Sequence, residues 1–203
     1  MAVGDAQYRE GYTLGFRGAV IEVLQADGSA VTPTPTTFGI KTPQELGYEF
    51  GVIEGNETQL RGGDIVLTNV KETDIITSAS LSMTNAKFDL ECTYHIAGGT
   101  LVTEEIDLVD YNTGWEFPTL SEQYSKVPFK FSGYVANYDS AGKVNSYFVA
   151  HFWYCMGYLN GVTHADQEWG TPEFTIYAEE NGAQSKPIVT YDWEDTLPTE
   201  LTA

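Results

Sequence analysis

The sequence is short of basic residues and of long apolar runs. Only 10 of its 203 residues are Lys or Arg, against 29 Asp or Glu, which gives a net charge of −19. Binding to phosphate or to anionic lipid needs clustered basic side chains, so this balance argues against a nucleic-acid-gripping or membrane-surface protein. The longest dense apolar run, residues 147–159, is too short to span a bilayer as a helix and contains His151.

Cysteine is also scarce, and no secretory signal is visible. Cys92 and Cys155 both stand in apolar surroundings. They could pair with each other, but buried thiols in a reducing compartment fit this setting better. Residues 1–10 lack a basic segment followed by an apolar one, which argues against a secretory signal. We therefore expect a protein made and assembled in a cytosol.

The residues that are present predict a β-rich globular chain. Hydrophobic residues make up 42%, which is too many for a disordered chain, and 20 glycines suit a fold with many turns. The length predicts a single domain over residues 1–203, closed by a C-terminal tail over 195–203. The strands expected from alternation and turn signals cover residues 15–24, 127–138, 144–156, 174–178 and 188–193.

Residues 42–63 predict a long arm. The segment holds five glycines and a cluster of acids and amides between 54 and 59, while Tyr48, Phe50 and Val52 alternate just before that cluster. This pattern predicts an extended hairpin with a polar tip, and loops of this length are usually functional or disordered. The candidate interface residues on the arm are Tyr48, Phe50, Val52, Glu54, Glu57 and Arg61.

A strand pair and one helix are predicted to follow the arm. Residues 64–70 and 74–83 have the alternation expected of two paired strands. Phe88, Cys92 and Ile96 then recur at helical spacing, with Thr84 or Asn85 as the expected N-cap and a Gly-Gly pair at 98–99 as the stop. Residues 107–125 are expected to be irregular.

No residue pattern supports catalysis or a cofactor. The three histidines have none of the spacings of zinc enzymes, and His164, Asp166 and Glu168 would share a face only if that segment were extended. Acidic clusters at 104–107 and 192–195 could supply a glycosidase pair, but such pairs are expected by chance among 29 acids. The sequence has neither a nucleophile elbow nor a phosphate-binding loop. We expect a protein that is not an enzyme, with no catalytic, cofactor or metal residues.

The order of elements resembles the major tail protein, or tail tube protein, of long-tailed bacteriophages. The resemblance lies in the arm, then DIVLTNV and DIITSASLSM running into the helix NAKFDLECTYHIAGG, and then SYFVAHFWYCMGYLNG and an acidic end, TYDWEDTLP. The most family-like phrase is TPEFTIYAEEN, residues 171–181. The resemblance covers roughly residues 10 to 195.

The resemblance implies a structural virion protein with a β-sandwich or barrel-like tail-tube domain, one flanking helix and a long loop between rings. Six copies would form a ring, and stacked rings would form the tail tube through which DNA passes during genome ejection. A ring would carry six times the net charge of −19, which would let DNA slide without specific binding. The implied partners are further copies of the chain and the tape-measure, tail-terminator and tail-tip proteins. The expected location is the virion, after assembly in the bacterial cytoplasm and without a membrane.

Two other functions stay open from the sequence. A carbohydrate-binding or host-binding β-sandwich module would use exposed tryptophans to stack on sugars, and the chain offers Trp115, Trp153, Trp169 and Trp193. A glycosidase-like enzyme would use Glu104 or Glu194.

Overall fold

A computed structural model describes residues 11–62, 64–106, 108–163, 166 and 170–202. The main body is one eight-stranded antiparallel sheet with the order β2-β1-β9-β10-β11-β6-β3, in which β12 also pairs with β10. The prediction of a mostly-β domain is confirmed. The strands of this sheet are β1 (Tyr12–Val23), β2 (Thr37–Ile40), β3 (Pro43–Ile53), β6 (Ile75–Asn85), β9 (Phe129–Tyr138), β10 (Val144–Thr163), β11 (Thr171–Glu179) and β12 (Val189–Glu194).

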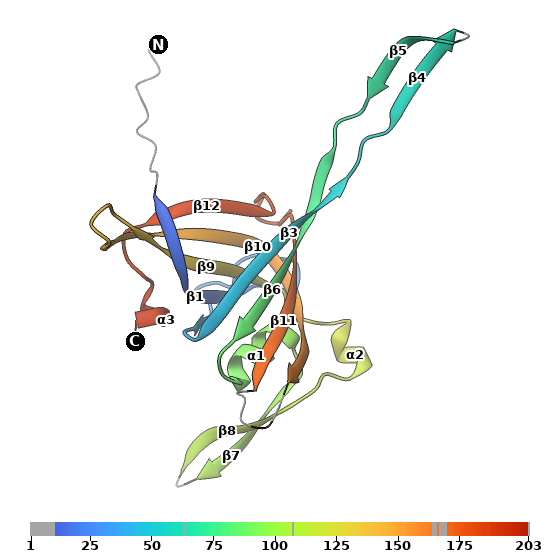
Figure 1. Ribbon diagram of the computed structural model, residues 1–203. Helices are drawn as coiled ribbons and strands as arrows, with labels where there is room; N and C mark the ends of the chain where they lie inside the picture. The colour runs from blue at the N-terminus through green and yellow to red at the C-terminus, as the bar shows by residue number, and fades with distance from the viewer. Residues whose placement is uncertain (1–10, 63, 107, 164–165, 167–169, 203) are drawn as a thin grey trace.

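The 20-residue strand β10 joins the two halves of the sheet. Its first half pairs with β9 on one side and β12 on the other, and its second half pairs with β11. The register against β9 shifts between Phe152 and Cys155, and such bulges bend a strand. The sheet therefore curls, so that β3, β6 and β11 cross over β1, β9 and the start of β10 (Figure 1).

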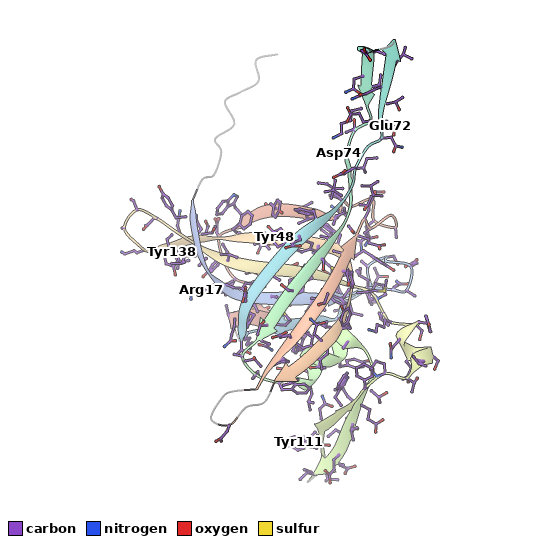
Figure 2. The ribbon with its side chains drawn as sticks, turned by 45° about the vertical axis from the view of Figure 1, so that its right-hand side comes forward. Arg17, Tyr48, Glu72, Asp74, Tyr111 and Tyr138 are labelled. Carbon is purple, nitrogen blue, oxygen red and sulfur yellow. The ribbon has the colours of Figure 1, made fainter. Side chains whose placement is uncertain are left out.

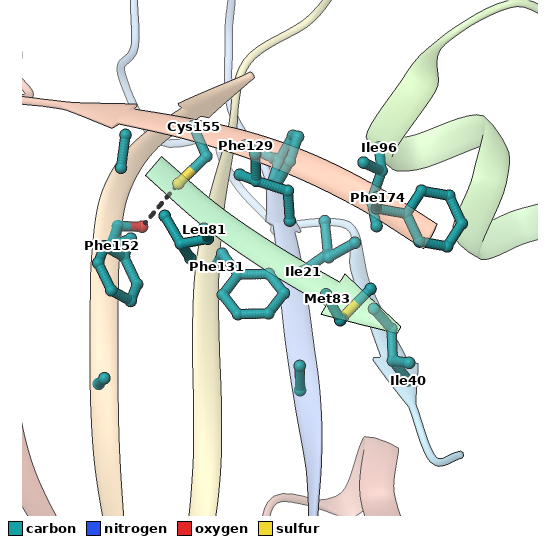
Figure 3. Packing of buried hydrophobic residues seen from close by; sticks show 14 of the residues in the cluster. Ile21, Ile40, Leu81, Met83, Ile96, Phe129, Phe131, Phe152, Cys155 and Phe174 are labelled. Carbon is teal, nitrogen blue, oxygen red and sulfur yellow. Dashed lines mark hydrogen bonds between the residues drawn. The ribbon is translucent and has the colours of Figure 1, made fainter. Parts of the chain in front are cut away.

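The core lies between these two halves. Phe131 and Phe152 come from β9 and β10, while Leu81 and Phe174 come from β6 and β11, which cross them, and all four side chains are buried (Figure 3). Strand β11 shows the reason, because its burial alternates residue by residue, as expected when one face covers a core. The C-terminal residues cover part of the opposite face, where Leu197 and Leu201 pack against Val20, Tyr134 and Val149.

Helix α1 (Leu90–Ala97) closes one end of the core with Cys92 and Ile96. The expected N-cap was wrong, because Thr84 and Asn85 are the last residues of β6. Asp89 caps the helix instead, and its carboxylate accepts hydrogen bonds from the backbone N–H groups of Glu91 and Cys92. The predicted stop is confirmed, because Gly98 takes a φ of 75° that favours glycine. Two short helices, α2 (Leu120–Gln123) and α3 (Thr199–Thr202), were not expected.

Two hairpins project from the body at opposite ends (Figure 1). One consists of β4 (Glu57–Gly62) and β5 (Ile65–Lys71) and continues the β3–β6 pair. The other consists of β7 (Thr100–Ile106) and β8 (Val109–Glu116). The predicted pairing of residues 64–70 with 74–83 was wrong, because β5 pairs with β4 while β6 pairs with β3 and β11. Both predicted strands belong to the returning half of a single arm.

Candidate functional site

The arm formed by β3, β4, β5 and β6 is the most prominent feature outside the core. Residues 42–63, predicted as the whole arm, supply its outgoing half, and β5 and β6 supply its return. The expected polar tip is not where the acids and amides lie, because Glu57 is paired with Lys71 at the near end of the β4–β5 ribbon and the ladder continues to Gly62 and Ile65. The sequence pattern predicted the turn near residues 54–59, before its actual position, because the polar residues at the start of β4 are also typical of a loop.

The β4–β5 ribbon has one apolar face and one polar face. Thr58 lies opposite Val70, and Leu60 lies opposite Thr68, so these four side chains share a face. Leu60 is 58% exposed and Val70 is 61% exposed. The ribbon is a sheet of two strands, so no third strand of the described chain extends it. The chain therefore presents to solvent a strand face of the kind that normally covers a core.

The opposite face of the ribbon is held by polar side chains. Asn69 donates from Nδ2 to Glu57 Oε1 at 2.6 Å, and Gln59 Nε2 donates to the same oxygen at 3.3 Å. These two hydrogen bonds, of which that from Asn69 has the larger effect, lower the pKa of the Glu57 carboxyl. Glu57 therefore carries its negative charge at neutral pH while holding the two strands in register.

A joint separates the ribbon from the rest of the arm. Between the β3–β6 and β4–β5 ladders, the Gly55 N–H donates to Asp74 Oδ1 at 2.9 Å and the Glu72 N–H donates to Asn56 O at 2.9 Å (Figure 2). Lys71 Nζ lies 3.3 Å from Asp74 Oδ2. A Cβ on Gly55 would lie 2.1 Å from the Glu72 carbonyl oxygen, so only glycine fits this approach.

The six candidate residues on the arm divide between the core, the joint and the ribbon. Tyr48 packs on the core, with its ring centroid 5.4 Å from that of Phe152, and its hydroxyl accepts a hydrogen bond from Tyr191 at 3.1 Å. Phe50 and Val52 follow on β3 and are 38% and 52% exposed. The remaining candidates are Glu54, which is exposed beside the joint, Glu57 on the polar face, and Arg61, which pairs with Val66 in the ladder and whose side chain lies outside the described part.

The β7–β8 hairpin was missed by the sequence reasoning, which expected residues 107–125 to be irregular. Val102, Ile106, Val109 and Tyr111 share one face, as the register shows, and all four are at least 40% exposed. Part of β7 and β8 has the alternation of apolar and polar residues that predicts strands. The register shift between Val102 and Thr103 interrupts this alternation. Glu104 lies opposite Tyr111 on the same face as the four apolar side chains, while Glu105 and Asp110 lie opposite each other on the other face, so acidic residues stand on both faces of the hairpin near its tip. Tyr111 marks the hairpin in Figure 2.

Leu108, next to the turn of this hairpin, is 91% exposed. Its φ is 65°, in the left-handed region that branched or bulky side chains rarely adopt. Leu108 lies between the paired residues Ile106 and Val109, and tight hairpin turns require positive φ angles, so the turn imposes this conformation on an exposed leucine.

A cavity of about 450 Å³ opens between α1, the end of β1 and the segment after α2. Its apolar lining includes Val23, Ile96, Val127, Phe129 and Met156. Lys126 also lines it and donates from Nζ to Gly157 O at 2.8 Å, while burial lowers the pKa of this ammonium group. His95 lines it as well, and burial lowers its pKa, with Glu91 opposing the shift.

The candidates for enzymatic chemistry are not brought together. Glu104 lies on β7 and Glu194 on β12, which belong to different sheets, and neither lines the cavity. Burial, reinforced by Asp192, raises the pKa of Glu194. Glu194 Oε1 lies 3.9 Å from His151 Nε2, and His151 Nδ1 lies 2.8 Å from Ser132 Oγ. Burial and Lys130 lower the pKa of His151 to about 4, so the imidazole is neutral at pH 7.

The remaining chemistry-bearing residues are dispersed. The predicted metal candidates His164 and Glu168, and also Trp169, lie outside the described residues. Within the described ranges, no group of three or more His, Cys, Asp or Glu could hold a metal ion, and no helix is long and apolar enough to cross a membrane. Cys92 and Cys155 are unpaired and buried, and burial raises the pKa of both thiols.

The other three tryptophans lie at separate places. Trp115 donates to Gly98 O beside the cavity, and Trp153 donates to Thr190 Oγ1. Trp193 packs edge-on against Phe148, with ring centroids 5.3 Å apart.

Comparisons with known proteins find distant structural neighbours. No protein-family model matches the chain, and no curated protein matches its sequence. Among solved structures, the chain is similar to one from the tube-terminating cap of the anti-feeding prophage, with 11% identity, a TM-score of 0.36, and coverage of 95% of this chain and 99% of that one. It is also similar to a chain of the anti-feeding prophage baseplate, with 9% identity, a TM-score of 0.34, and coverage of 92% and 96%. TM-scores of this size do not establish a shared fold.

Proposed function

We propose that the chain is a structural subunit of a phage-tail-like particle, in which six copies form a ring and rings stack into a hollow tube. The observation that carries this proposal is the apolar face of the β4–β5 ribbon, where Leu60 and Val70 are exposed. A two-stranded ribbon is marginally stable in water by itself. A ribbon held far from its own core and apolar on one face is suited to a surface supplied by another copy.

The main sheet also leaves an edge for ring closure. Strand β3 ends the sheet order, so one side of its 11-residue length has no further strand of the described chain beside it. Open edges template pairing with another chain unless they are covered. Pairing of unlike edges is heterologous, and such contacts close into rings when the rotation between subunits allows it.

The charge suits a conduit for DNA. Residues 100–116 of the second hairpin contain no Lys, Arg or His, and Glu105 and Asp110 lie together on its polar face. A lumen lined by such faces would repel the phosphate backbone, so DNA would pass without specific binding during genome ejection. The partners would be copies of this chain together with the tape-measure, tail-terminator and tail-tip proteins, and the site of action the virion after assembly in the bacterial cytoplasm.

The test is electron microscopy of the purified chain after concentration at neutral pH, beside a variant that lacks residues 57–71. A deletion of residues 47–62 would be a poor test, because it removes Tyr48 from the core. Removal of β4–β5 spares the core and joins Asn56 to Glu72, whose backbones are already hydrogen-bonded. We expect rings or tubes from the intact chain and a folded, unassembled domain from the variant.

Two results would contradict the proposal. The first is assembly of the shortened variant into the same tubes. The second is an intact chain that stays monomeric at all concentrations and also with tail-tip components added.

A second candidate function, binding of carbohydrate or of a host surface, rests on an aromatic shelf. Tyr191 is 47% exposed and stacks on Phe148 at an interplanar angle of 20°, with Trp193 and Tyr48 beside them. Flat exposed aromatic rings can stack on sugar rings. Retention of the chain on a polysaccharide gel, and its loss in Tyr191→Ala, would favour this function over assembly.

A further inference from the structure

We propose that the tip of the β7–β8 hairpin, carried by Leu108, inserts into the cavity beside α1 of a second copy of this chain. The inference rests on the proposed self-assembly and assigns one of its contacts. The tip has an apolar side chain that is 91% exposed, and the cavity of about 450 Å³ is lined by apolar side chains together with Lys126, His95 and Glu122. In the single chain, the Leu108 side chain faces solvent and the cavity is open to solvent. In a pair of chains, the cavity of one copy would cover the leucine of the other.

The cavity is large enough for the tip. Pockets that enclose small apolar ligands begin at about 300 Å³, so a leucine side chain with part of its turn fits in this volume. Val127 stands at the rim and is 54% exposed, and Met156 is 39% exposed, so the entrance is open to solvent. The hairpin tip is narrow because β7 and β8 carry no third strand in the described chain.

The charges of the two surfaces also correspond. The hairpin carries Glu104, Glu105 and Asp110 near its tip and no basic residue. Among the groups that line the cavity, Lys126 carries a positive charge, and its ammonium group has two donors beyond the one given to Gly157 O. Glu122 also lines the cavity, and hydrogen bonds from the Thr119 backbone N–H and hydroxyl lower its pKa and keep it negatively charged, so Lys126 is the group that attracts an acidic tip.

The contact must be intermolecular. Gly98 and Gly99 line the cavity and directly precede β7, so the hairpin begins at the cavity rim. The seven residues of β7 then carry the tip away by roughly 20 Å at an extended rise of about 3.3 Å per residue. A tip that is held at this distance from its own cavity can fill only the cavity of another copy. Such a tip-to-cavity contact is heterologous and propagates into a closed ring or a filament.

The experiment uses disulfide trapping between two full-length single variants, Leu108→Cys and Val127→Cys, mixed under mild oxidation. The native Cys92 and Cys155 are buried and do not compete. The matched control replaces Leu108→Cys with Leu60→Cys, an exposed leucine on the other hairpin. We expect the Leu108–Val127 pair to form a mixed dimer about tenfold faster or more than the control pair, because docking of the hairpin tip at the cavity rim raises the effective concentration of the two thiols.

A second pair of variants tests the cavity without cysteine. Val127→Trp fills the entrance, whereas Tyr124→Trp adds a similar ring at a neighbouring position that is 92% exposed and does not line the cavity. We expect Val127→Trp to abolish association as measured by sedimentation velocity, and Tyr124→Trp to preserve it. Leu108→Asn, which tolerates the left-handed conformation, should also abolish association while the chain stays folded by circular dichroism.

The outcomes separate this inference from the proposed function. Rings or tubes that form equally well with Val127→Trp, and that give no excess of the Leu108–Val127 disulfide, would overturn the tip-to-cavity contact and leave self-assembly intact. A chain that neither associates nor cross-links at any concentration would overturn both.

Discussion

Strand β11 and the β4–β5 ribbon have the same kind of sequence and opposite surroundings. In β11, Phe174, Ile176 and Ala178 alternate with polar residues and are buried under the chain's own sheet and helix. In the ribbon, Leu60 and Val70 also stand on a single face, yet both are more than half exposed. Alternation in a sequence therefore predicts that one face of a strand will be covered, without saying which molecule covers it.

The largest expected effect is on the free energy of unfolding, when a side chain of the buried core is truncated. Phe131→Ala removes a fully buried ring from the core and should lower the free energy of unfolding by about 3–5 kcal/mol. Leu60→Ala removes an exposed side chain and should change it by no more than about 0.5 kcal/mol in the monomer. Urea unfolding followed by tryptophan fluorescence measures both. Equal destabilisation by the two variants would mean that the ribbon is packed in the single chain.

The second prediction concerns association rather than folding. Leu60→Asp places a charge on the apolar face of the ribbon, and Gln59→Asp places the same charge on the adjacent polar face. If the apolar face is buried against another copy, the first change should weaken association by about 2–3 kcal/mol and the second by much less. Sedimentation velocity over a concentration series gives the comparison. An equal loss in both variants would assign the effect to charge alone.

The third prediction is that the free energy of unfolding depends on pH through His151. The pKa of His151 is lowered to about 4 in the folded chain, by burial and by Lys130, against 6.5 ordinarily. As pH falls from about 6.5 to 4, the unfolded chain takes up a proton that the folded chain does not, so stability falls by up to about 1.4 kcal/mol per pH unit. His151→Gln should reduce this slope in urea unfolding. Glu194, whose pKa burial raises, is present in both proteins, so the difference between the two slopes belongs to His151.

The smallest expected effect tests the helix that covers the end of the core. Asp89→Ala removes the carboxylate that accepts two backbone N–H groups of α1 and should cost about 1 kcal/mol of stability. Asp89→Asn keeps a capping oxygen and should recover most of that loss. Thermal unfolding by circular dichroism resolves the two, and identical midpoints for Asn and Ala would exclude a capping role.

The sequence predicts the main strands, the end of α1 and the presence of an arm because each depends on local alternation or on glycine. It fails at Asn85, because a capping residue type at the end of a strand looks the same as one at the start of a helix. It fails at the β5–β6 pairing because neighbouring strands in a sequence need not pair, and the arm is long enough to separate them. It misses the cavity because Val23, Ile96 and Val127 come from separate elements that only the fold brings together.

The joint at Gly55 and Asp74 has a mechanical consequence. In the described chain, hydrogen bonds of Gly55 and Glu72 join the two ladders there and no strand pairing crosses the joint, so we expect the arm to bend at this place before either ladder is disturbed. In the proposed tube, bending lengthens one side and shortens the other, and rigid arms would have to detach from the next ring. Arms that bend at this joint would stay in contact with the next ring, so a small rotation in each subunit would accommodate the curvature of the proposed tube.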